Sequence, residues 1–112
     1  MKINVDKKLK AYIAYLKSEA SSNAQYRLDP IQIRVLNEIL FSLSDNKAIK
    51  VGDILLLSEI ASQATLHAAL KKLVANKMIV YRTVSNSRAK YLEITDLGHK
   101  RFLELLKAFS GK

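Results

Sequence analysis

Apolar residues recur at spacings of three and four along two segments of the chain, which predicts two amphipathic helices. The first segment covers residues 5–20. The second covers residues 30–43, and its apolar positions take up so much of the circumference that we expect this helix to be buried on more than one side. Its start has Asp29 as the N-cap, Pro30 at the first helical position and Gln32 where a capping box needs it. The stripe of the first segment consists of Val5, Leu9, Tyr12, Ile13, Leu16 and Ala20.

The rest of the pattern predicts a short element, a third long helix, a hairpin and a last helix. Residues 52–60 are apolar over too short a run to distinguish a helix capped by Asp53 from a buried strand. Ser62 is the expected N-cap of a helix over about residues 62–76. Residues 79–84 and 90–94 flank a polar turn and predict a two-stranded hairpin, with Tyr81 and Tyr91 expected to pair across it. Thr95 is expected to cap a helix over about residues 96–109.

This order of elements is typical of one fold class. A short helix, a longer capped helix and a hairpin in succession predict a winged helix-turn-helix, a mainly α fold with a small β-hairpin wing (α+β). Residues 62–76 are then the recognition helix and residues 79–94 the wing. The three glycines and one proline mark no linker, so we expect a single domain over residues 1–112.

Composition excludes several classes of protein. The chain has 112 residues, is 49% hydrophobic and contains no cysteine, which argues against a disordered chain, a disulfide scaffold, a zinc ribbon and a thiol enzyme. It has no apolar run near the roughly 20 residues of a membrane span, and its first residues turn polar where a signal peptide would be apolar. We therefore expect a cytoplasmic location. The sequence also lacks a phosphate loop, metal-ligand spacing and a nucleophile motif, so we expect neither an enzyme, a cofactor nor a bound metal.

The charge is strongly positive and unevenly placed. The net charge is +9, and residues 61–92 contain six cations and no acidic residue. The predicted recognition helix and hairpin tip both lie in this basic window. An ordinary solvated face is the alternative, but the coincidence favours a surface that binds nucleic-acid phosphates. The six cations are Lys71, Lys72, Lys77, Arg82, Arg88 and Lys90.

The sequence resembles the MarR family of winged-helix transcription regulators. Residues 28–36 (LDPIQIRVL) are similar to the family's entry into its first core helix, residues 62–73 (SQATLHAALKKL) to its recognition helix, and residues 76–79 (NKMI) to the approach to its wing. Residues 87–100 (SRAKYLEITDLGHK) are similar to its second wing strand and C-terminal helix start. The resemblance spans about residues 28–106. It implies a homodimeric regulator, most often a repressor, that binds a pseudo-palindromic operator in double-stranded DNA.

The resemblance also implies how the DNA is contacted. The recognition helix would enter the major groove, where Gln63, Thr65 and His67 approach base edges. The wing would reach the minor groove through Arg88. Asn86 stands where the family often has an aspartate two residues before the wing arginine, so we expect no ion pair between that position and Arg88. The residues expected near the DNA are Ser62, Gln63, Thr65, His67, Lys71, Lys72, Ser87, Arg88 and Lys90.

The two terminal helices are the expected dimerisation elements, over about residues 5–20 and 96–109. A small-molecule effector is compatible with the resemblance, but no residue of the sequence argues for one. The alternative function is a winged helix that acts as a protein-interaction or adaptor module in a replication or partition assembly. In that case the apolar terminal helices would serve a different partner.

Overall fold

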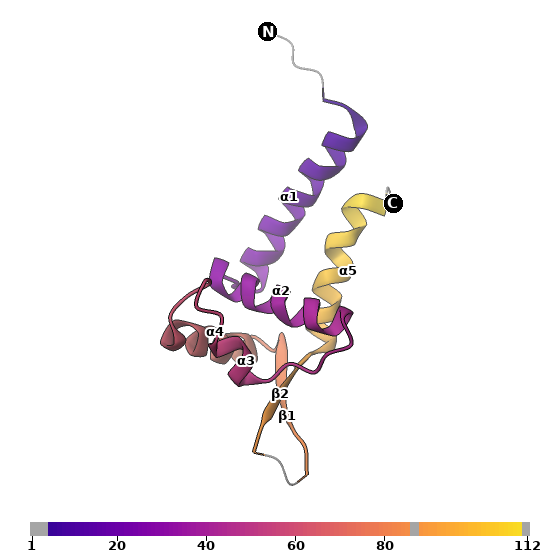
Figure 1. Ribbon diagram of the computed structural model, residues 1–112. Helices are drawn as coiled ribbons and strands as arrows, with labels where there is room; N and C mark the ends of the chain where they lie inside the picture. Colours follow the sequence, from indigo (N-terminus) through magenta and orange to yellow (C-terminus); the bar gives the residue numbers. More distant parts are fainter. Residues whose placement is uncertain (1–4, 86–87, 111–112) are drawn as a thin grey trace.

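Seven elements follow one another in the computed structural model, which describes residues 5–85 and 88–110. Helices α2 to α4 and the hairpin form a winged helix, and α1 and α5 project from it side by side as two arms (Figure 1). The mainly α fold with a small hairpin, predicted from the sequence, is confirmed. The elements are α1 (Lys7–Gln25), α2 (Pro30–Ser44), α3 (Val51–Leu55), α4 (Gln63–Ala75), β1 (Ile79–Thr83), β2 (Lys90–Ile94) and α5 (Asp96–Ser110).

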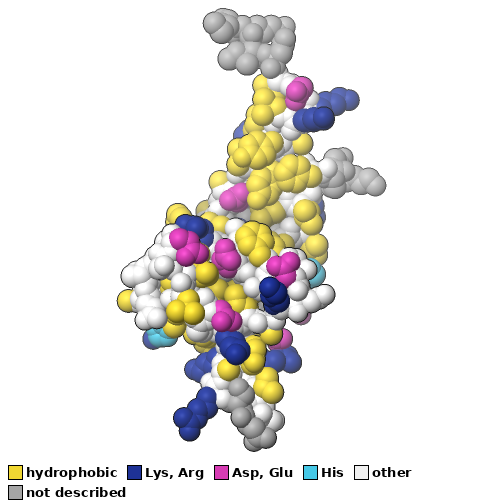
Figure 2. All heavy atoms as spheres, in the orientation of Figure 1, with side chains coloured by type: hydrophobic (Ala, Val, Ile, Leu, Met, Phe, Trp, Pro, Cys, Tyr) yellow, Lys and Arg dark blue, Asp and Glu magenta, His cyan; other side chains and the backbone are white. Residues whose placement is uncertain are grey.

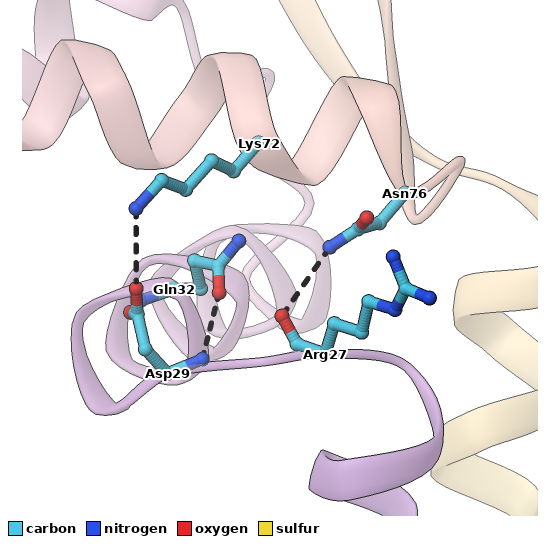
Figure 3. Close-up of polar contacts among 5 residues, drawn as sticks. All are labelled: Arg27, Asp29, Gln32, Lys72 and Asn76. Atoms are coloured by element: carbon cyan, nitrogen blue, oxygen red, sulfur yellow. Dashed lines mark hydrogen bonds and ion pairs between the residues drawn. The ribbon is translucent and has the colours of Figure 1, made fainter.

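Side-chain caps begin α2, α4 and α5 where the sequence predicts them, whereas α3 begins at Val51 and has Asp53 inside the helix and not at its N-cap. At the start of α2, the Asp29 carboxylate accepts a hydrogen bond from the backbone amide of Gln32 at 2.8 Å. In return, the backbone amide of Asp29 donates to Gln32 Oε1 at 2.7 Å (Figure 3). The Ser62 hydroxyl accepts from the Thr65 amide at the start of α4, and the Thr95 hydroxyl accepts from the Gly98 amide in α5. Each cap satisfies a backbone donor that a helix start leaves unpaired.

Two predicted segments differ from the structure. Helix α1 continues to Gln25, five residues beyond the predicted end, because neither glycine nor proline interrupts residues 21–25; it ends just before Arg27, whose φ is +57°. In the ambiguous segment 52–60, helix α3 ends at Leu55 and turns follow, so residues 54–57 do not form a strand. The strand-like pairing lies earlier, where Lys50 bridges to Tyr91 of β2.

The hairpin register separates the two tyrosines that were expected to pair. Tyr81 lies opposite Leu92, and Tyr91 lies opposite Arg82. Because opposed residues share a face of the hairpin and neighbours along a strand alternate, the two rings lie on opposite faces. The expected tyrosine pair is therefore wrong. Instead, Lys90 Nζ lies 5.4 Å from the Tyr81 ring centroid, and Lys50 Nζ lies 5.8 Å from that of Tyr91.

The core lies between α2, α4 and the hairpin. Its fully buried members confirm that α2 is central and that the predicted inner face of α4 is the buried one. With these side chains inside, the opposite face of α4 is left at the surface. The side chains with no exposed area are Val35, Leu36, Ile39, Ile54, Leu66, Leu70, Leu73, Met78 and Ile79.

The arms leave much of their apolar surface uncovered within the chain. The less exposed side of α1 carries Ala11, Ser18 and Ser22 and faces α5, whereas the predicted apolar stripe points to solvent. Figure 2 shows this apolar surface along the arms. Residues 36–59% exposed there are Leu9, Tyr12, Ile13, Leu16, Leu103, Leu106 and Phe109. None of the described helices is both long and apolar enough to cross a membrane.

Candidate nucleic-acid interface

One face of α4 is exposed over its whole length, and we call it the reading face. It consists of Gln63, Ala64, His67, Ala68 and Lys71. Residues four apart on a helix lie one above the other, so Gln63, His67 and Lys71 form a polar row. Within the described residues, neither the side-chain amide of Gln63 nor the ring of His67 forms a hydrogen bond, so both are available to a ligand.

Ser62 and Thr65 lie at the start of α4, where they are hydrogen-bonded to each other. The Ser62 hydroxyl donates to Thr65 Oγ1 at 3.0 Å and accepts from the Thr65 amide at 3.2 Å. Both side chains are exposed, and the first turn contains no acidic residue. The positive end of the helix dipole is therefore not neutralised by its own sequence, which favours an approaching anion.

Lys72 does not join the reading face. Its ammonium lies 3.7 Å from Asp29 Oδ2, at the capped start of α2, while Asn76 Nδ2 donates to the Arg27 carbonyl at 3.4 Å (Figure 3). These contacts connect α4 to the corner between α1 and α2. Lys71, the adjacent residue, remains on the reading face. From the sequence, both Lys71 and Lys72 were expected near the DNA. The sequence does not show that Asp29, which caps α2 with one carboxylate oxygen, turns the other toward Lys72 of α4.

The wing carries exposed cations around the hairpin, where Figure 2 shows Lys and Arg side chains gathered. Arg82 Nε lies 2.6 Å from Glu93 Oε1, so this arginine is paired across the strands. Arg88 and Lys90 are exposed, and no ion pair of theirs is found among the described residues. Ser87, the remaining predicted contact, and Asn86 lie outside the described residues.

The basic window therefore divides into two groups. Lys72 and Arg82 are paired with carboxylates inside the chain. The other four cations, Lys71, Lys77, Arg88 and Lys90, are exposed and form no ion pair within the described residues. These four retain their charge for an outside anion. Leu55, at the end of α3, was not among the predicted site residues and lines an open hollow together with Gln63, Ala64 and His67 of α4. The sequence of either segment alone does not show which residues of two separate elements come together.

A separate cavity of about 500 Å³ lies where the arms meet α2. Arg101 is 1% exposed there, and its Nη2 donates to Asn23 Oδ1 at 2.8 Å, while its Nε has no hydrogen-bond partner within the described chain. Burial lowers the pKa of Arg101 from its ordinary value, and burial raises that of Tyr15, with a further contribution from the hydrogen bond to Glu19. The lining of the cavity combines apolar side chains with one carboxylate and one buried cation. Its lining includes Tyr15, Glu19, Phe41, Arg101 and Phe102.

Comparisons with known proteins support the fold. No protein-family profile and no curated protein sequence matches the chain. The transcriptional regulator Tm0710 from Thermotoga maritima is 17% identical, with a TM-score of 0.68 over 89% of this chain and 67% of that one. S. aureus MepR, solved as a complex with DNA, is also 17% identical, with a TM-score of 0.69 over 95% of this chain and 78% of its own. The chain thus has the winged-helix fold of these regulators, and the resemblance seen in the sequence is confirmed for the fold.

Proposed function

We propose that this chain is a transcription regulator of the MarR type that binds double-stranded DNA as a homodimer and acts as a repressor. The observation that carries the proposal is the surface of α4 and the wing. Among the described residues, the side chains of Gln63 and His67 form no hydrogen bond, and Lys71, Arg88 and Lys90 are exposed and have no acidic partner. One protein of the same fold was solved as a complex with DNA, which supports duplex DNA as the anion that this surface binds.

In this proposal the reading face enters the major groove and the wing reaches the adjacent minor groove. The major groove admits an α-helix and presents donors and acceptors that amide and imidazole side chains can read. Lys71 and Ser62 are assigned to phosphates beside the helix, and so is Thr65, in place of the base edge that the resemblance implied, because its hydroxyl is hydrogen-bonded to Ser62 at the start of α4. Arg88 is the wing residue for the minor groove, with Lys90 behind it. Lys72 helps to hold α4 against the start of α2 and does not itself contact a base or a phosphate.

The proposed dimer forms through the arms. Apolar residues on a surface helix are expected to find a partner when they form a continuous stripe. The stripes of α1 and α5 remain exposed in the single chain, with Leu106 at 59% and Leu16 at 45%. A second copy of the chain presents the same stripes, so a two-fold pairing would cover both. The wings and reading faces of the pair would then meet two half-sites.

The salt dependence of duplex binding tests this proposal. Affinity for duplex DNA should fall steeply between 50 and 200 mM salt, roughly 1000-fold or more for six phosphate contacts per dimer. Arg88→Ala should weaken binding on the order of tenfold on every sequence and lower the salt slope by about two, one for each protomer. Fluorescence anisotropy with a labelled duplex measures both effects.

Lys17→Ala is the matched control, because it removes an exposed cation from α1, far from the wing. It should leave affinity and salt slope within about twofold of the parent. Binding that is independent of salt, or none at 50 mM salt, contradicts the proposal. A monomer without duplex binding would instead favour the adaptor function, with the apolar arms as the docking surface.

A further inference from the structure

The reading face borders an open hollow whose lining is mostly apolar. Leu55, from the end of α3, and Ala64, from the first turn of α4, line it together with Gln63 and His67. Leu55 is half-buried and Ala64 is exposed, so apolar surface is presented to solvent beside the polar row. Two polar side chains without hydrogen bonds in the described chain thus line the same hollow as the two apolar ones.

The size of the hollow depends on Ala64. On a helix, His67 is the neighbour of both position 63 and position 64, so a longer residue at 64 would extend toward His67 and take up part of the hollow. The methyl of Ala64 and the branched end of Leu55 offer only dispersion contacts and no hydrogen bond. A polar group placed there would lose its water without replacement. The hollow therefore suits a small apolar group that arrives between two polar ones.

We infer that the hollow holds the 5-methyl group of a pyrimidine, which in unmodified DNA is thymine; this inference rests on the proposed function. The thymine methyl is the apolar group that base edges present in the major groove, and alanine is among the side chains suited to contact it. Gln63 offers an amide that can pair with adenine N6 and N7. The structure thus assigns Leu55 and Ala64 to the recognition of one thymine in each half-site, beside the base read by Gln63.

Deoxyuridine in place of thymine tests the methyl group alone, since the two bases pair identically. In the tightest duplex obtained by selection, each thymine of a half-site is replaced in turn and the Kd is measured at 50 mM salt. One position should weaken binding roughly three- to fivefold, the value of one buried methyl group, and the others less than twofold. At that position, a C·G pair should bind more tightly with 5-methylcytosine than with cytosine, by a similar factor.

Two exposed alanines of the same helix provide the variant and its control. Ala64→Ser adds a hydroxyl to the methyl group that lines the hollow, and it should bring the ratio of the affinities for the thymine and deoxyuridine duplexes close to one. Ala68→Ser makes the same change one turn away, outside the hollow, and should leave the ratio unchanged. Circular dichroism checks that both variants fold.

The possible results separate the inference from the proposed function. If the duplex binds but no thymine shows a methyl effect, or if the effect survives Ala64→Ser, the inference is wrong and the DNA-binding proposal stands. If the protein binds no duplex at 50 mM salt, the proposed function itself is wrong. A methyl effect that Ala64→Ser removes and Ala68→Ser preserves supports both.

Discussion

Replacing Leu16 by glutamate is expected to convert the proposed dimer into a monomer and to weaken binding to a duplex with two half-sites about 100-fold. Leu16 lies in the middle of the uncovered stripe of α1 and is 45% exposed in the single chain. A carboxylate there would have to lose its hydration inside an apolar contact, which is costly without a partner. Once the protomers separate, the two half-sites are no longer bound as one event. Gel filtration with light scattering should give 12.6 kDa for the variant, and anisotropy should give the affinity.

Ala14→Glu is the matched control for this experiment. Ala14 is exposed on α1, lies away from the apolar stripe and is flanked on that side by Lys10 and Lys17. The same carboxylate introduced there should leave the mass and the duplex affinity of the parent. Leu106→Glu, on the second arm, should repeat the effect of Leu16→Glu. A parent protein that is already monomeric, or a Leu16→Glu variant that remains dimeric, would disprove the proposed arm interface.

The second large effect is expected in stability, at the junction between the wing and α5. Gly98 packs so closely that a Cβ at this position would lie 2.5 Å from the Met78 carbonyl oxygen and 2.8 Å from Ile94 Cγ2. The carbonyl cannot move freely, because it also accepts a hydrogen bond from the Thr95 backbone amide at 3.0 Å. Gly98→Ala should therefore lower the free energy of unfolding by about 1–3 kcal/mol.

The expected loss corresponds to a fall in Tm of roughly 5–20 °C for a domain of this size, measured by circular dichroism at matched protein concentration. Gly52→Ala is the control, since a Cβ at that position of α3 meets no atom within 4 Å. Alanine should be neutral there or stabilise by up to about 1 kcal/mol, because it restricts the unfolded chain and favours a helix. Equal Tm values for the two variants would refute the close packing at Gly98.

Local chemistry explains which parts of the fold could be predicted from the sequence. Asp29, Ser62 and Thr95 each begin a helix by hydrogen bonds to residues three positions later, and such signals are complete within a few residues. The inner face of α4 follows from its spacing alone. The end of α1 was missed because it depends on the backbone of Arg27 and on packing against α5. The segment 52–60 was undecided because a helix of five residues shows no period.

The sequence predicted which face of α4 is exposed, but it could not predict which of the cations form ion pairs inside the chain. Spacing assigned Gln63, His67 and Lys71 to one exposed surface, which the structure shows. It could not separate Lys71 from Lys72, because only the approach of α2 gives Lys72 its carboxylate partner. The pairing of Arg82 with Glu93 likewise depends on the register of the hairpin. Contacts between elements distant in sequence therefore reduce six candidate cations to four.

Selection of bound fragments from a random duplex pool tests the central claim most directly, because it examines DNA binding, symmetry and spacing together. If the chain is a dimer that reads duplex DNA through α4, the enriched sequences should share an inverted repeat. The centres of its two half-sites should lie about one helical turn apart, roughly 10 base pairs. Enrichment of a single half-site without symmetry would contradict the dimer. A pool that remains random after repeated selection at low salt would contradict sequence-selective binding of DNA.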